Sequence, residues 1–161
     1  MDLLVNLYDL QCMHDDQKLA ANGIVIRRAM SPDKGKVMDF IRKHYGEGWT
    51  YESEHALMNT PVSCYIAIQN QEIVGFACYD ATAKGYFGPI GIKPGQKGGG
   101  IGQSLMYETL CGMREAGYGY AIIGWVDEAV GFYEKTLKMY PIPDSEPANT
   151  IYQNLTFLAG E

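Results

Sequence analysis

The segment Lys97-Gly98-Gly99-Gly100-Ile101-Gly102 has the residue types of a loop that holds an anion. Four glycines within five residues let a backbone approach a phosphate without interference from Cβ atoms. Leu105 and Leu110 follow at helical spacing, so the loop leads into a helix. The first turn of a helix presents N–H groups without an intrahelical acceptor, and the helix dipole favours negative charge there. The sequence therefore predicts a phosphate site rather than a plain flexible turn.

Two other phosphate-binding loops are excluded by the spacing. A P-loop ends in Gly-Lys-Ser/Thr, whereas Gly102 is followed by Gln103-Ser104. A dinucleotide fingerprint that starts at Gly98 has Gln103 where its third glycine should be, and one that starts at Gly100 has Leu105 there. The strands predicted before the loop are antiparallel hairpins, whereas the fingerprint requires a parallel unit.

The elements predicted around this loop alternate between strands and helices. Strands are expected at residues 3–10, 24–28, 63–69, 72–79, 85–92, 120–126 and 151–158, where apolar and β-branched residues gather. Helices are expected at residues 31–45 and 51–58, over residues 105–116, and from Asp127 or Glu128 to Leu137, where apolar residues recur at helical spacing. This order predicts an α/β (α+β) fold, a single domain whose mixed, mostly antiparallel twisted sheet has about six to seven strands flanked by about four helices.

The sequence predicts that the first residues form a segment separate from the main domain. Leu3 to Leu10 is apolar enough for a strand, but Met13 to Asn22 is polar. We therefore expect an N-terminal arm at residues 1–22 and the domain at residues 23–161. The apolar part of the arm and the C-terminal strand are the surfaces expected for a homodimer.

The composition excludes several classes of protein. The 161 residues suit one domain, and the net charge of −6 argues against a nucleic acid or a membrane surface as partner. The four cysteines, Cys12, Cys64, Cys78 and Cys111, lack metal-ligand spacing, so neither a disulfide nor a metal site is expected. No basic segment with an apolar core follows Met1, which predicts a cytoplasmic protein.

Two segments together resemble the signature of Gcn5-related N-acetyltransferases, the GNAT family. Ile90-Gly91-Ile92-Lys93-Pro94, followed by Lys97 to Gly102, is similar to the family's strand, proline and Arg/Gln-x-x-Gly-x-Gly/Ala sequence. Ala129-Val130-Gly131-Phe132-Tyr133-Glu134-Lys135 is similar to the family's Ala-x-x-Phe-Tyr-Glu-Lys helix. The distance between the segments and the order of the elements also match, over residues 24–158. The resemblance implies a GNAT-like acyl-CoA N-acyltransferase domain.

The same resemblance implies that acetyl-CoA is the cosubstrate. Backbone groups at the strand before the loop would hold the pantetheine arm, and the amides of the glycine loop would hold the pyrophosphate. The residues implied for coenzyme binding are Ile90, Gly91, Ile92, Lys97, Gly98, Gly99, Gly100, Ile101, Gly102, Gln103 and Phe132. Tyr133 would lie near the thioester sulfur and stabilise the departing thiolate.

The sequence departs from the family pattern at three positions. Lys97 stands where relatives carry Arg or Gln, so a charge is kept but the planar guanidinium fork is lost. Val126 replaces an Asn that contacts pantetheine in many relatives, and Lys138 replaces a Gly that ends the last helix. None of these changes removes the predicted phosphate cradle.

Acyl transfer to an amine also requires a proton acceptor. A primary amine with a pKa near 10.4 must lose a proton before it attacks. Many relatives carry a Glu on the strand before the glycine loop, whereas Tyr86 to Pro89 contains no carboxylate. The base is left open among Asp80, Asp127, Glu128, Glu47, Glu52 and His55.

The acceptor is expected between the first two predicted helices. Tyr45 to Glu52 combines aromatic rings with carboxylates, which suits a cationic or hydroxyl-rich small molecule. The residues expected at the acceptor are Tyr45, Trp49, Tyr51 and, at the end of a strand, Trp125. The predicted reaction moves an acetyl group from acetyl-CoA to a primary amine of a small molecule or peptide, directly within a ternary complex. Transfer of another acyl group, or to oxygen, and a weakly catalytic or non-catalytic acyl-CoA sensor remain as alternatives.

Overall fold

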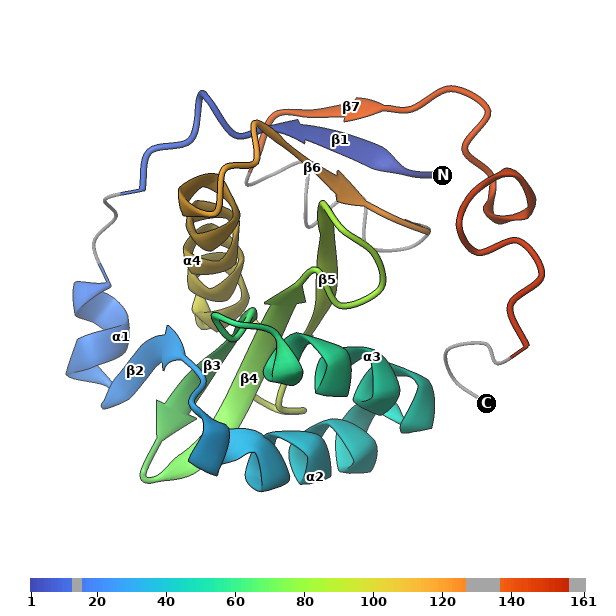
Figure 1. The fold of residues 1–161 in the computed structure, drawn as a ribbon. Helices are drawn as coiled ribbons and strands as arrows, with labels where there is room; N and C mark the ends of the chain where they lie inside the picture. Colours follow the sequence, from blue (N-terminus) through green and yellow to red (C-terminus); the bar gives the residue numbers. More distant parts are fainter. Residues whose placement is uncertain (13–15, 127–136, 157–161) are drawn as a thin grey trace.

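The computed structural model of the chain describes residues 1–12, 16–126 and 137–156. Within these residues, seven strands form one sheet in the order β2-β3-β4-β5-β6-β1-β7 (Figure 1). The strands are β1 (Leu3–Asn6), β2 (Ile24–Arg28), β3 (Cys64–Gln69), β4 (Glu72–Tyr79), β5 (Tyr86–Ile92), β6 (Tyr120–Ile123) and β7 (Met139–Pro141). All neighbours pair antiparallel except β5 and β6, which are parallel. The predicted mixed, mostly antiparallel sheet is confirmed.

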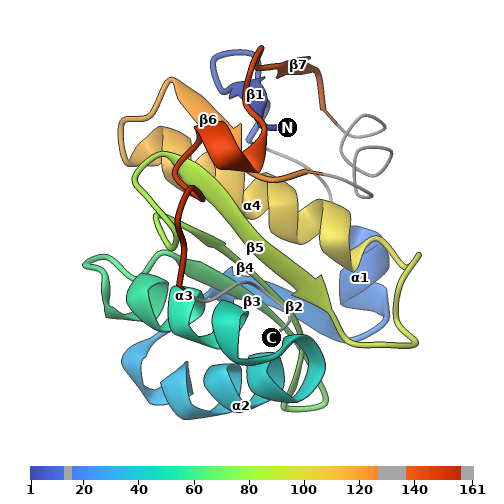
Figure 2. The same cartoon turned by 90° about the vertical axis from the view of Figure 1, so that its right-hand side faces the viewer.

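Helices cover both faces of this sheet (Figures 1 and 2). In the described ranges they are α1 (Gln17–Ala21), α2 (Lys34–Tyr45), α3 (Glu47–Met58) and α4 (Ile101–Glu115), with short 3-10 turns η1 (Ser31–Asp33) and η2 (Pro147–Asn149). Successive residues of β3 point to opposite faces, because side chains alternate along a strand. Tyr65 and Ala67 therefore join the core under α4, whereas Cys64 and Ile66 join the core under α2 and α3. None of the helices in the described part is long and apolar enough to cross a bilayer.

Two predicted helix starts differ from the structure. Residues 31–33 form the 3-10 turn η1, and the α-helix begins only at Lys34. The next helix begins at Glu47 rather than Tyr51. Gly46 has φ +90°, in the region that favours glycine, and it reverses the chain in a single residue. Most of the segment expected to be an acceptor loop, from Glu47 onward, is therefore helical.

Strand β1 lies inside the sheet, although its residues were predicted to belong to an appended arm. Leu3 pairs with Ile123 of β6 on one side and with Pro141 of β7 on the other. The side chains of Leu3, Val5, Leu7 and Leu10 are buried in the core of the same chain. This apolar run is therefore not available as the dimer surface expected from the sequence.

The predicted C-terminal strand is also different in the structure. Residues 151–154 form turns, and residues 157 and 158 lie outside the described ranges. The strand β7, at Met139–Pro141, follows the predicted helix that ends at residue 137, in a segment where no strand was expected. After η2 the chain descends in front of the sheet toward α3 (Figure 2). The C-terminal segment therefore borders the sheet instead of extending it.

Strands β5 and β6 separate shortly after they begin. Their pairing covers only Tyr86 with Ile122 and Phe87 with Ile123. The register between β4 and β5 shifts between Ala77 and Tyr79, opposite Gly88-Pro89. Proline has no N–H to donate to a ladder, and a bulge increases local twist, so β5 turns away from β6 there. Among the described residues, no strand pairs with the side of β5 that faces away from β4 between Gly88 and Ile92.

A disulfide joins Cys12 to Cys111, contrary to the prediction of free cysteines. The Cα atoms lie 5.6 Å apart, a separation typical of disulfides. The partners are 99 residues apart, so local spacing could not reveal the bond. Cys64 and Cys78 face each other across β3 and β4, and both are free and buried, as expected of cysteines in apolar strands.

Candidate active site

The glycine loop ends at the N-terminus of the 15-residue helix α4. Gly100 is its N-cap residue, with φ +89° and ψ 0°, a left-handed conformation that L side chains rarely adopt. The first intrahelical bond runs from the Ser104 N–H to the Gly100 carbonyl, and no side chain in the described part of the chain caps the helix. The N–H groups of Ile101 and Gly102 lie before Ser104, so they have no acceptor within the helix and face outward from its N-terminus. The predicted anion-binding geometry is therefore present in the backbone.

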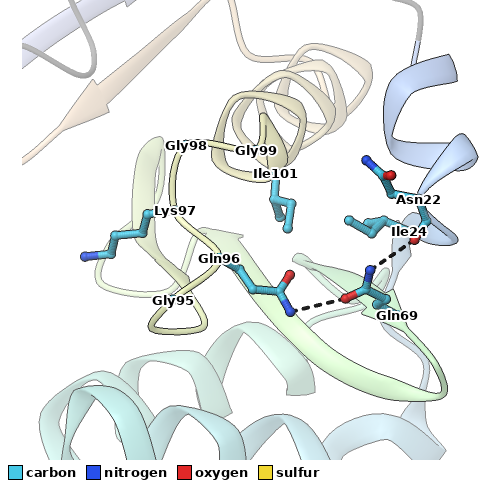
Figure 3. A pocket seen from close by; sticks show the side chains of 9 residues that line it. All are labelled: Asn22, Ile24, Gln69, Gly95, Gln96, Lys97, Gly98, Gly99 and Ile101. Carbon is cyan, nitrogen blue, oxygen red and sulfur yellow. Dashed lines mark hydrogen bonds between the residues drawn. The ribbon is translucent and has the colours of Figure 1, made fainter.

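An open groove of about 470 Å³ lies beside this loop (Figure 3). It is lined by Asn22, Ile24, Gln69, Gly95, Gln96, Lys97, Gly98, Gly99 and Ile101. Gln96 Nε2 donates to Gln69 Oε1 at 3.2 Å, and Gln69 Nε2 donates to the Asn22 carbonyl at 3.0 Å. The Lys97 ammonium points away from this chain of amides (Figure 3). Gln69 and Gln96 were not predicted here, because only folding places the β3–β4 turn beside the glycine loop.

The open edge of β5 presents the backbone groups that the resemblance assigned to pantetheine. The Lys93 N–H bonds to the Val74 carbonyl of β4 at 2.8 Å. Because polar groups alternate along a strand, Ile90 and Ile92 turn their N–H and C=O groups to the opposite side, where β6 has departed. An extended ligand can form strand-like hydrogen bonds with such an edge.

Tyr45 occupies part of this edge. Its hydroxyl donates to the Ile92 carbonyl at 2.5 Å and accepts from the Ile92 N–H at 2.8 Å. A Cβ on Gly91 would lie 2.5 Å from the Tyr45 ring, so glycine permits this close approach. Burial raises the pKa of Tyr45, which keeps the phenol protonated. The structure thus places the Tyr45 hydroxyl at the predicted coenzyme edge.

The other aromatic residues expected at the acceptor do not form one cluster. Trp49 stacks on Tyr45, with ring centroids 5.0 Å apart, and is half-buried. Tyr51 is exposed on α3, where its pKa is raised mainly by a hydrogen bond with Glu47. Trp125 lies just beyond β6 and contacts the ring of Tyr152 edge-on at 5.2 Å.

The end of β6 is held by the N-terminal segment. Trp125 has φ +51°, and its N–H donates to Asp2 Oδ1 at 2.9 Å. The side chain of Asp2 is buried, and its backbone N–H donates to Ser145 Oγ at 2.8 Å. A buried carboxylate that accepts a backbone N–H can hold a left-handed residue in place. Asp2 therefore fixes the direction in which β6 leaves β5.

A second group of side chains gathers where β5 and β6 part. The Tyr152 ring lies on Gly124, where an added Cβ would be 2.3 Å from the phenol oxygen. Tyr152 interacts electrostatically with Glu52 of α3, and burial together with Glu52 raises its pKa. The Glu52 carboxylate accepts a hydrogen bond from Thr82 Oγ1 at 2.9 Å. Burial raises the pKa of Glu52, an effect that the Thr82 hydrogen bond opposes.

Four of the candidate residues are not described by the structure. Phe132 and Tyr133, with Asp127 and Glu128, lie outside the described ranges. Among the residues that are described, no three His, Cys, Asp or Glu side chains come together in a way that could hold a metal ion.

The start of helix α4, with the backbone amides of its first turn, lies beside the open edge of β5. The chain belongs to the Acetyltransferase (GNAT) family, whose sequence pattern matches residues 31–139. The chain is therefore an acetyltransferase-family domain, as the resemblance indicated.

Individual relatives agree with this assignment. Mycothiol acetyltransferase of Streptomyces scabiei (strain 87.22) is 30% identical over 104 residues, covering 63% of this chain and 29% of that protein. A GCN5-related glucosamine N-acetyltransferase region of a fungal multi-domain β-N-acetylglucosaminidase has a TM-score of 0.67 at 14% identity, covering 86% of this chain and 19% of that one. A GNAT family acetyltransferase from Brucella melitensis, solved with acetyl-CoA, has a TM-score of 0.51 at 20% identity, covering 69% and 82%. The chain thus spans less than a third of the first two proteins.

Proposed function

We propose that the protein transfers an acetyl group from acetyl-CoA to a primary amine of a small molecule, directly within a ternary complex. The observation that carries this proposal is the open edge of β5 leading to the uncapped start of α4. In this proposal, Ile90, Ile92 and the glycine loop bind the coenzyme, and Lys97 adds a positive charge near its phosphates. The relative solved with acetyl-CoA supports the choice of coenzyme.

In the proposed reaction, the β5 edge positions the coenzyme and Tyr133 then acts on the thioester sulfur. The β5 edge orients the coenzyme arm so that the thioester lies where β5 and β6 part. Tyr133, on the segment that resembles the family's Phe-Tyr-Glu-Lys helix, donates a hydrogen bond to the sulfur as the thiolate forms. A thiol has a pKa of about 8.5 and a phenol of about 10, so hydrogen bonding is favoured over complete proton transfer.

Calorimetry with coenzyme A and thiol release from acetyl-CoA test this proposal together. The amines are glucosamine, sisomicin, spermidine and lysine. We expect coenzyme binding and thiol release that depends on at least one amine. Tight binding without turnover of any amine would favour an acyl-CoA sensor, and absence of binding would reject the coenzyme site itself.

The proposal has a consequence for Tyr45. Its hydroxyl forms two hydrogen bonds with the backbone of Ile92, so a pantetheine arm that uses Ile92 must displace it. Tyr45→Phe removes this competition, which at about 1 kcal/mol corresponds to roughly fivefold tighter binding. We expect the Kd of coenzyme A to fall by about that factor in calorimetry, while the Kd of adenosine 3′,5′-bisphosphate, which lacks the arm, stays constant.

Tyr51→Phe is the matched control for this experiment, because Tyr51 is exposed on the following helix. An equal change for both ligands, or weaker binding of coenzyme A, would show that Tyr45 does not compete with the arm.

The cytoplasm remains our expected compartment. The Cys12–Cys111 disulfide is the observation against it, because disulfides are rare in reducing compartments.

A further inference from the structure

The identity of the proton acceptor can be narrowed from the partners of each candidate carboxylate. Asp80 accepts hydrogen bonds from the Tyr118 hydroxyl at 2.9 Å and from the Gly85 N–H at 2.8 Å, so it closes the β4–β5 turn. Glu47 forms an ion pair with Arg42 at 2.9 Å on the outside of the helices. His55 is exposed near the end of α3. Each of these three has an ordinary structural role or an outward position.

Glu52 differs from them in both position and partners. It is half-buried, and in the described part of the chain its carboxylate accepts one hydrogen bond, from Thr82, and is paired with no cation. An ionised carboxylate can accept about four hydrogen bonds, so Glu52 can accept further donors beside the Thr82 hydroxyl. A partly buried carboxylate without a cation needs donors from water or from a ligand, and a cationic ligand would supply both donors and charge.

The neighbours of Glu52 show that it lies close to the point where β5 and β6 stop pairing. It lies near Tyr152, whose ring rests on Gly124, the first residue after β6. The titratable groups that interact with Tyr152 there are Glu52, Asp2 and Tyr86. Four separate parts of the chain, α3, the β4–β5 loop, the end of β6 and the C-terminal segment, thus converge at this point. It is the same point at which the proposed coenzyme arm ends.

We propose that Glu52 receives the proton which the acceptor's ammonium group loses before attack, and that the acceptor is a primary amine that arrives as a cation. This inference rests on the proposed function. The Glu52 carboxylate takes one proton from R–NH3⁺, and the free amine attacks the thioester carbonyl carbon. The C–N bond forms and the C–S bond breaks, while a second amine proton passes to the departing thiolate. Glu52 then releases its proton to solvent.

The pH dependence follows from the state of Glu52. Only the ionised carboxylate accepts a proton, so kcat/KM rises with pH through the pKa of Glu52. Because burial raises that pKa, the acidic limb of the profile lies above the pH at which an ordinary glutamate ionises.

The test compares pH profiles of kcat/KM for wild type, Glu52→Gln, Glu52→Asp and Glu54→Gln, using the amine from the panel that wild type acetylates best. Glu54 is the matched control, because it lies on the same helix and its side chain is 45% exposed. We expect Glu52→Gln to lower kcat/KM about 100-fold and to remove the acidic limb. Glu52→Asp should keep the limb at reduced activity, and Glu54→Gln should resemble wild type. Coenzyme A should bind all four proteins equally in calorimetry.

Three results would overturn the inference. The first is Glu52→Gln activity within threefold of wild type with the same acidic limb. The second is a loss of coenzyme binding in that variant, since Glu52 would then act on the fold or the coenzyme. The third is wild type that binds coenzyme A but acetylates no amine, which rejects the proposed function as well.

Discussion

Leu7→Ala is expected to lower the free energy of unfolding by about 2–5 kcal/mol. The Leu7 side chain is fully buried, and its N–H donates to the Gly119 carbonyl at 2.9 Å just beyond β1. Truncation removes apolar contacts and leaves a cavity in the core beneath α4, which the fixed ends of β1 and β6 cannot close. Urea denaturation followed by circular dichroism measures the change.

Val25→Ala is the matched control for Leu7. Val25 lies on the edge strand β2, and 58% of it is exposed, so its truncation should change stability by no more than about 0.5 kcal/mol. If Leu7→Ala changed stability as little as this control, residues 3–10 would be a loosely attached arm after all.

Tyr133→Phe is expected to lower kcat about 100-fold while leaving the Kd of coenzyme A unchanged. The substitution keeps the ring but removes the hydroxyl that, in the proposed reaction, donates to the forming thiolate. This contact exists only as the C–S bond breaks, so its loss affects the transition state and not coenzyme binding. Thiol release at saturating acetyl-CoA measures kcat, and calorimetry measures Kd.

Tyr140→Phe provides the comparison for Tyr133, since Tyr140 lies exposed on β7. Activity of Tyr133→Phe within threefold of wild type would assign the stabilisation of the thiolate to another group. A parallel loss of coenzyme binding would indicate a packing role.

The sequence predicted correctly those strands and loops whose signals lie within a few neighbouring residues. The hairpin of β3 and β4, strand β5, and the loop that leads into α4 depend on alternation, turn residues and glycine, all visible within a few residues. The start of α3 was missed because Gly46 and Gly48 both suggested an interruption, whereas only Gly46 makes a turn. Sequence spacing shows that a glycine permits a turn but not which of two glycines makes it.

Contacts between distant residues could not be predicted in this way. Tyr45 and Ile92 are 47 residues apart, and nothing near Tyr45 indicates that its hydroxyl reaches the β5 backbone. Glu52 was one of six candidate bases, and nothing near it in the sequence indicated that it would lie beside Thr82 and Tyr152. The disulfide and the position of β1 likewise depend on which distant segments meet.

The position of β1 also affects how the protein is made. Leu3 pairs with Ile123, so a ribosome must add about 120 residues before the first strand meets its partner. At 5–20 residues per second, this takes about 6–24 s. During that time, the apolar side chains of β1 are available to chaperones and to neighbouring nascent chains. Although β1 is synthesised before the other strands of this sheet, it is therefore among the last to pair, and the yield of folded protein should depend on how well it is protected until then.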